Sequence, residues 1–180
     1  MSDSPENAIV LAHRRVYDGK VLALDVDEVQ EPEGVRAVRE VVRHRGSVAA
    51  LPVQGDGRVV LVRQYRYAVD ERLWEIPAGR LDPGETPAEG ARRELEEEVG
   101  LRVSALDLLL VFYTTPGFCD ERLHLFRASG LTEGTARPEA DERIELGTFT
   151  LDEARAMIGR GEVRDGKTLL ALLLECERRK

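Results

Sequence analysis

The sequence has few cysteines, no long apolar run and no excess of positive charge. Its two cysteines, Cys119 and Cys176, match neither a disulfide framework nor a CxxC metal motif, which favours a reducing compartment. The longest apolar runs contain six residues, whereas roughly 20 are needed to cross a bilayer. The N-terminus is acidic and polar where a secretory signal would be basic and then apolar. We therefore expect a cytoplasmic protein without a membrane span.

The charge balance limits the class of partner. The chain of 180 residues has 26 Lys and Arg against 34 Asp and Glu, a net charge of −8. Nucleic-acid grooves depend on Lys and Arg to neutralise phosphates, so we expect no nucleic-acid partner. The acidity is concentrated, because residues 79–101 carry seven acids and three bases, which is half of the net charge. The length suits one domain, or one domain with a small appendage.

Periodicity and turn residues predict an α/β fold with a mixed sheet. Alternating segments at 21–29 and 35–42, with a Glu-Pro-Glu-Gly turn between them, predict an antiparallel hairpin. Two more apolar segments, 48–53 and 59–62, predict a second hairpin that is buried on both faces. We place a boundary near residue 45, with an N-terminal β segment at 1–45 and the main domain at 46–180. Further expected elements are strands at 105–114, 122–128 and 144–150, a loop at 130–142, and helices at 151–159 and 167–178.

One helix, predicted at 87–99, carries an unusual charge pattern. Thr86 and Glu89 have the spacing of a capping box, and Gly100 suits the C-terminal end. Glu94, Glu97 and Glu98 have i, i+3, i+4 spacing, so their like charges project from one face and destabilise the helix unless something lies between them. Mg²⁺ binds to proteins through a few carboxylates together with waters and substrate phosphates. A solvated acidic face is the alternative interpretation.

The residues around this cluster decide between the two interpretations. The segment GRLDPGETPAEGARRELEEEVGL, residues 79–101, fills every defining position of the Nudix box. The chain therefore resembles the Nudix hydrolases, which implies an α/β/α sandwich and a loop-helix-loop that binds divalent metal, usually Mg²⁺ with Mn²⁺ as a possible substitute. The resemblance implies metal ligands at Glu94, Glu97, Glu98 and the carbonyl of Ala78. It also implies that Glu85 and Arg93 orient the loop and the helix.

Segments outside the box indicate a subgroup. LVRQYR at 61–66, LWEIPAG at 73–79 and Pro116 are similar to segments of ADP-ribose pyrophosphatases. This resemblance implies hydrolysis of ADP-ribose to AMP and ribose 5-phosphate. The substrate contacts that it implies are Arg66 to phosphate or ribose, Glu121 to the terminal ribose, Glu75 holding Arg66 or the dimer, and Arg80 near phosphate. Each of these side chains has a structural or solvated role as its alternative.

A general base is also needed, and the subgroup takes it from a late acidic loop. Glu142 is the first candidate here and Glu139 the second, while Glu97 belongs to both the catalytic and the metal-binding candidates. The subgroup is typically a homodimer whose N-terminal β segment reaches the partner, and Tyr17 is a candidate for stacking on the adenine.

Two other functions remain open at this point. One is hydrolysis of another nucleoside diphosphate sugar, such as GDP-mannose or an ADP-sugar, since small pocket changes redirect specificity. The other is a nucleotide-sensing Nudix module without turnover.

Overall fold

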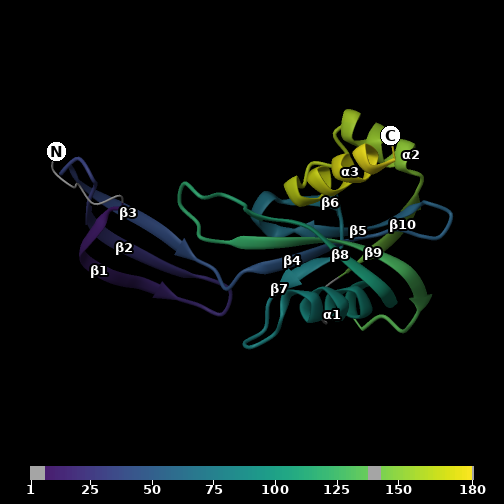
Figure 1. Cartoon of the computed structure of the whole chain (residues 1–180), viewed down its shortest axis with the longest axis horizontal. Helices are drawn as coiled ribbons and strands as arrows, with labels where there is room; N and C mark the ends of the chain where they lie inside the picture. Colours follow the sequence, from purple (N-terminus) through teal and green to yellow (C-terminus); the bar gives the residue numbers. More distant parts are fainter. Residues whose placement is uncertain (1–6, 138–142, 180) are drawn as a thin grey trace. The chain divides into compact units, whose positions relative to one another are not determined.

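The computed structural model describes residues 7–137 and 143–179, and this part of the chain contains both strands and helices (Figure 1). The elements in chain order are β1 (Ile9–Asp18), β2 (Ala23–Gln30), β3 (Arg36–Arg43), β4 (Ser47–Pro52), β5 (Val59–Arg66), the 3-10 turn η1 (Tyr67–Val69), β6 (Glu71–Glu75), β7 (Ala78–Arg80), α1 (Pro87–Val99), β8 (Leu101–Tyr113), β9 (Arg122–Glu133), β10 (Glu145–Phe149), α2 (Leu151–Gly159) and α3 (Gly166–Arg178). No helix in the described residues is long and apolar enough to cross a membrane.

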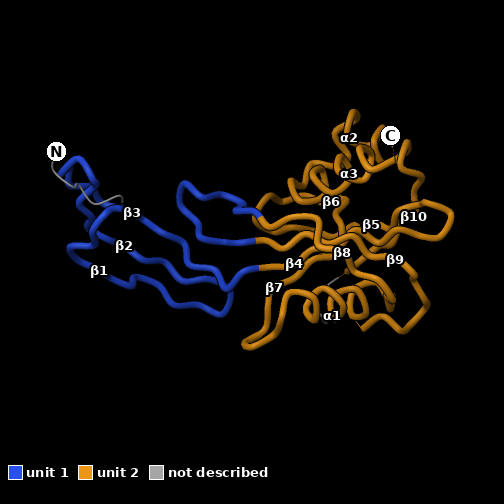
Figure 2. Tube along the Cα trace, in the orientation of Figure 1, with its two compact units in different colours: residues 1–46, 112–122 blue, residues 47–111, 123–180 orange. Residues whose placement is uncertain are grey.

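The chain divides into two compact units (Figure 2). The first contains residues 1–46 together with 112–122, and the second contains 47–111 and 123–180. Segment 112–122 joins the first unit because the Val42 amide donates to the Phe118 carbonyl at 2.8 Å and the Asp120 amide donates to the Val42 carbonyl at 3.1 Å. The predicted boundary at residue 45 treated this segment as part of the main domain, and that division stays a prediction.

The first unit contains an antiparallel sheet in the order β1-β2-β3. Strands β2 and β3 form the predicted N-terminal hairpin, closed by hydrogen bonds between Glu31 and Val35 and between Gly34 and Glu31, both 2.8 Å. Gly34 has a positive φ of 85°, which glycine adopts without a steric penalty. The pairing strand β1 was not predicted, because its residues are exposed and do not alternate in polarity.

The second unit has sheets on the inside and helices on both sides (Figure 1). One sheet has the order β10-β5-β6, and the other has the order β7-β4-β9-β8, in which β4 is parallel to β9 and antiparallel to β7. Helix α1 covers one side, and α2 and α3 cover the other. The core under α1 combines β4, β5 and β9 side chains with Ala91, Leu95 and Val99. This arrangement is the predicted mixed α/β architecture.

The prediction of a second hairpin was wrong. Strands β4 and β5 are joined by a turn in which Gly57 donates to the Gln54 carbonyl at 2.9 Å, but apart from one bridge, Val53 to Val59, they do not pair. Each strand joins a different sheet, β4 beside β9 and β5 beside β10 and β6. Their predicted burial is confirmed, since all six residues of β4 are buried. Strand β9 also extends to Glu133, into the segment predicted as a loop from 130.

Candidate metal centre

Helix α1 is fixed at both ends by local hydrogen bonds. Thr86 accepts from the Glu89 amide at 3.3 Å, and the Glu89 carboxylate accepts from the Thr86 amide at 2.9 Å, so the predicted capping box is confirmed. Gly100 ends the helix at φ 65° in the left-handed region, where a residue with a Cβ is strained. Leu95 is fully buried. The buried side chains of α1 pack against the core. This packing fixes the orientation of the helix about its own axis and therefore the direction in which its glutamates project.

Two of the predicted metal ligands lie against the Ala78-Gly79 backbone. Glu98 is only 4% exposed, and its Oε2 accepts from the Ala78 amide at 3.1 Å. A Cβ built on Gly79 would lie 1.9 Å from Oε1 of Glu94. Glycine at position 79 therefore makes room for the Glu94 carboxylate, and the Ala78 carbonyl, also a predicted ligand, belongs to the same short strand β7.

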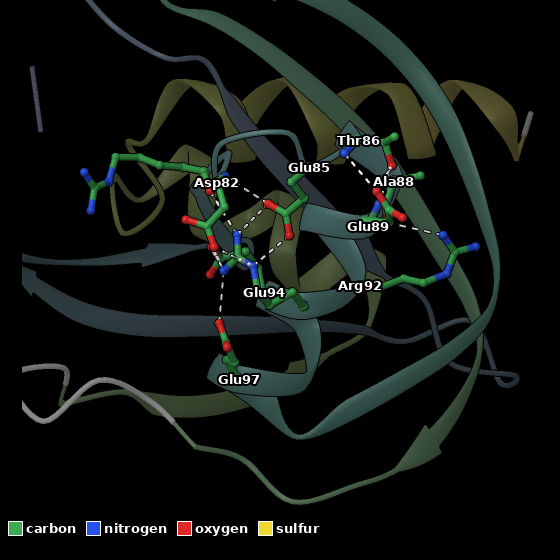
Figure 3. A network of polar contacts seen from close by, with 10 residues as sticks. Asp82, Glu85, Thr86, Ala88, Glu89, Arg92, Glu94 and Glu97 are labelled. Carbon is green, nitrogen blue, oxygen red and sulfur yellow. Dashed lines mark hydrogen bonds and ion pairs between the residues drawn. The ribbon is translucent and has the colours of Figure 1, made fainter.

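Arg93 is the cation that Glu85, Glu94 and Glu97 share, and Figure 3 labels these three carboxylates. Its Nε and Nη2 donate to the two oxygens of Glu85 at 2.9 and 3.0 Å, its Nη1 donates to Glu94 at 2.7 Å and to Glu97 at 3.0 Å, and Nη2 also donates to the Arg80 carbonyl at 3.0 Å. Hydrogen bonding to Glu85, followed by that to Glu94, raises the pKa of Arg93 above its usual value. The Arg93 hydrogen bonds lower the pKa of Glu85. Arg93 thus joins the loop before α1 to the helix face.

The face is left strongly acidic. Glu85, Glu94, Glu97 and Glu98 lie on or beside it, and Arg93 is the guanidinium that bonds to the first three. Within 7–137 and 143–179, no three His, Cys, Asp or Glu side chains are already gathered closely enough to hold a metal. Glu94 and Glu97 instead point to Arg93. The oxygen donors suit a hard cation such as Mg²⁺, and a rotation of flexible glutamate side chains would move the carboxylates from Arg93 to the ion.

Arg66 and Glu75, two predicted substrate residues, form a bidentate pair on β5 and β6. Nε and Nη2 of Arg66 each donate to a Glu75 oxygen at 2.7 Å. Glu75 is 1% exposed. Burial alone would raise its pKa, but hydrogen bonds from Arg66 and the charge of Lys167 hold that pKa below its usual value. Arg66 keeps Nη1 without a hydrogen-bond partner in the described residues, and that group remains available as a donor.

Lys167 and its neighbours are site residues that the sequence analysis missed. The Lys167 ammonium lies 2.5 Å from Oε2 of Glu75 and 2.9 Å from Oδ1 of Asp165. Thr168 accepts from the Ile76 amide at 2.9 Å and donates to Asp165 at 2.6 Å. The start of α3 therefore holds the end of β6, immediately before the Ala78-Gly79 backbone. No local signal indicates this contact, because about 90 residues separate the partners.

The other predicted substrate and catalytic residues are found in several parts of the chain. Arg80 lies at the end of β7, where its carbonyl accepts from Arg93. Glu121 belongs to the first unit, where Oε2 accepts from the Thr114 hydroxyl at 2.8 Å and Oε1 lies 3.8 Å from Nδ1 of His44. Tyr17, on β1 in the same unit, is 57% exposed. Glu139 and Glu142, the predicted bases, lie outside the described residues.

A cavity of about 550 Å³ adjoins the acidic face of α1. Its lining includes Arg93, Glu97, Arg102 and Arg137. The Arg137 amide donates to the Glu97 carbonyl at 2.8 Å, so the chain after β9 is tied to the end of α1. The cavity thus combines arginine side chains with the predicted metal ligand Glu97.

Comparison with known proteins agrees with this geometry. The NUDIX domain model matches residues 43–172. The chain is 41% identical to the methanol dehydrogenase activator of Bacillus methanolicus, over 88% of this chain and 86% of that protein. It is 40% identical to the ADP-ribose pyrophosphatase of Bacillus subtilis (strain 168), over 90% and 89% of the two chains.

A solved structure shows the same fold. It is described as "Crystal structure of ADP compounds hydrolase", superposes with a TM-score of 0.85 at 23% identity, and is matched over 98% of this chain and 96% of its own. This likeness confirms the predicted fold class. The match of the family model over most of the chain, together with relatives at about 40% identity, shows that the protein belongs to the NUDIX domain family.

Proposed function

We propose that this chain is a Mg²⁺-dependent NUDIX hydrolase that splits ADP-ribose into AMP and ribose 5-phosphate. The observation that carries the proposal is the face of α1, where Glu85, Glu94 and Glu97 share Arg93 and Glu98 is buried against the Ala78 amide. The similarity to an ADP-ribose pyrophosphatase over 90% of the chain supports the choice of substrate.

Glu94, Glu97, Glu98 and the Ala78 carbonyl would hold Mg²⁺, or Mn²⁺ in its place. When bound, the ion supplies positive charge for the pyrophosphate oxygens and lowers the pKa of a bound water. Glu85 would keep Arg93 in place, because its two hydrogen bonds to Arg93 do not involve Glu94 or Glu97.

The other residues would bind the substrate and move the proton. Arg66 offers Nη1 to a phosphate oxygen while Glu75 holds its other edge. Arg80, the last residue of β7, would meet the same anion. Water attacks one phosphorus, the bond from that phosphorus to the bridging oxygen breaks, and the water proton passes to Glu142, or to Glu139 as the second candidate. AMP and ribose 5-phosphate then leave.

The proposal includes a homodimer in the cytoplasm. Strands β1 and β3 expose apolar side chains, including Ile9, Val10 and Val38 at 49%, 57% and 60%, and such surfaces mark protein interfaces when they are contiguous. Tyr17 on β1 would stack on the adenine, and Glu121 would bind the terminal ribose. Cys119 and Cys176 are both unpaired, which suits a reducing compartment. A monomeric mass at micromolar concentration would remove the dimer from this proposal.

A substrate panel tests the proposed reaction. Purified protein is assayed with ADP-ribose, ADP-glucose and GDP-mannose, each with Mg²⁺, with Mn²⁺ and with EDTA. We expect the highest kcat/KM for ADP-ribose and no turnover in EDTA. Equal or better turnover of GDP-mannose would reject the substrate. Absence of turnover with every metal would reject the hydrolase and favour a nucleotide-sensing module.

A further inference from the structure

A second cavity, of about 320 Å³, lies on the face of β6 opposite to Glu75. Its lining consists of Arg63, Arg72, Trp74, Gly161, Glu162 and Arg164. Trp74 and Glu75 are consecutive on β6, so their side chains point to opposite sides of the sheet. Arg63 pairs with Trp74 across the strands, and Arg72, two residues before Trp74, shares that face. The cavity is therefore separate from the α1 site.

The arginines of this cavity have few anionic partners. Arg63 lies over the Trp74 ring, 5.8 Å from its centroid, and its Nε is buried without a hydrogen-bond partner in the described part of the chain. Its closest ion-pair contact there is Glu145, at 3.9 Å. Arg72 is exposed, and its side chain has no hydrogen bond or ion pair among the described residues. Two guanidinium groups are thus left largely uncompensated.

The acids near the cavity are already engaged. Glu162 accepts from Arg160 at 2.6 and 3.1 Å, and Glu71 forms an ion pair with Arg164. In a chain of net charge −8, an arginine-lined cavity with unmatched positive charge favours an anion.

We propose that this cavity binds a phosphate group, as inorganic phosphate or as the monoester of a small sugar. Phosphate carries close to two negative charges near neutral pH, which matches Arg63 and Arg72, with Arg164 as a third donor group on the rim. The planar guanidinium fork suits phosphate oxygens in a bidentate arrangement. The proposal does not depend on the hydrolase activity, because neither α1 nor a metal takes part.

Trp74 provides a reporter for this site, because it is the single tryptophan of the chain. Its emission is recorded while inorganic phosphate or ribose 5-phosphate is added in EDTA at constant ionic strength, with chloride as the reference anion. We expect a saturable change for the phosphate compounds and none for chloride. Equal affinity for both compounds identifies the phosphate group as the ligand, and tighter binding of ribose 5-phosphate identifies a sugar phosphate.

Matched variants test whether the change in Trp74 emission arises from binding in this cavity. Arg72→Gln, at an exposed position, should weaken binding about tenfold, the effect of losing a charged hydrogen bond. Arg63→Gln should do the same, with its changed starting spectrum taken as its own baseline. Arg58→Gln, an exposed arginine on the β4–β5 turn that pairs with Asp56, should leave the affinity unchanged. The absence of a saturable change in the unaltered protein, or equal affinity in Arg72→Gln, would overturn the proposal.

Discussion

Two regions of this molecule gather carboxylates, and they differ in the number of cations that share them. On β2, Asp25 and Asp27 are 2% and 5% exposed. Arg43 donates to Asp25 at 2.9 Å and to Asp27 at 3.3 Å, Arg15 also bonds to Asp25, and His13 lies 2.6 Å from Asp27. At α1, in contrast, Glu94 and Glu97 of the helix share Arg93 with Glu85 of the preceding loop, and Glu98 is buried on the same helix.

We interpret the β2 carboxylates as a structural charge network and the α1 carboxylates as a candidate metal-binding site. The hydrogen bond from Arg15, followed by that from Arg43, lowers the pKa of Asp25 to about 2, so the sheet holds the Asp25 carboxylate charged with its own cations. A similar balance exists around Glu75, where Arg66 and Lys167 face Glu75 and Asp165. On the α1 face, Glu85, Glu94 and Glu97 all bond to Arg93, and a metal ion would add positive charge there.

Glu98→Gln should have the largest effect on activity. It removes a carboxylate from the acidic face of α1 but keeps the size of the side chain and an acceptor for the Ala78 amide. A loss of about 4 kcal/mol of transition-state stabilisation corresponds to about a 10³-fold lower kcat. Steady-state kinetics with Mg²⁺ measure this effect.

A control variant on the same helix separates loss of the Glu98 carboxylate from general disruption of α1. Glu89→Gln changes the capping box and not the acidic face, so it should keep kcat within about threefold while lowering stability by up to ~1 kcal/mol. If both variants lost activity equally, the loss would reflect the helix and not the acidic face.

Gly79→Ala should lower kcat about 10²-fold with little change in stability. The new Cβ would meet the end of the Glu94 side chain, which can rotate away at small cost to folding. A displacement of about 1 Å near the reacting groups is enough for such a loss of rate. Kinetics and urea unfolding of the same preparation measure both quantities. A large stability loss with unchanged kcat would show that Gly79 serves packing alone.

Lys167→Met should destabilise the protein by about 2 kcal/mol. This loss is smaller than that expected when a buried charge loses its whole ion pair, because Arg66 still bonds to Glu75 in the variant. Urea unfolding gives the free energy. Lys167→Arg retains the charge and should recover at least half of the loss. Unfolding curves of Lys167→Met that coincide with those of the unaltered chain would show that the balance around Glu75 is unimportant.

Asp25→Asn should change the response to acid more than the activity. The folded pKa of Asp25, about 2, is below the unfolded value of about 4. The carboxylate therefore contributes stability that is present above pH 4 and is lost as the pH falls through 2. The variant should be less stable at neutral pH and should lose less between pH 4 and 2. Urea unfolding across that range tests this, and parallel curves for both proteins would contradict it.

The predictions that succeeded depend on local signals. Thr86, Glu89 and Gly100 lie within or next to helix α1, so the helix and its capping box could be predicted from sequence. The β2–β3 hairpin is equally local, since residues 31–35 contain its whole turn.

The features that the sequence did not predict correctly, or did not predict at all, depend on distant pairing. The turn between β4 and β5 is local, but β4 pairs in parallel with β9, more than 70 residues later, so the turn alone wrongly indicated a hairpin. The Lys167 contact with Glu75 and the attachment of segment 112–122 to β3 likewise join segments far apart in the chain. Local periodicity contains no information about such partners.

Direct titration of metal binding tests the assignment of the acidic face of α1 as a metal site. Mn²⁺ is added to the unaltered protein, Glu98→Gln and Asp25→Asn without substrate, and free Mn²⁺ is followed by electron paramagnetic resonance. We expect saturable binding in the unaltered protein and in Asp25→Asn, and at least tenfold weaker binding in Glu98→Gln. Equal binding by the unaltered protein and Glu98→Gln would contradict the assignment of the α1 face as the metal site.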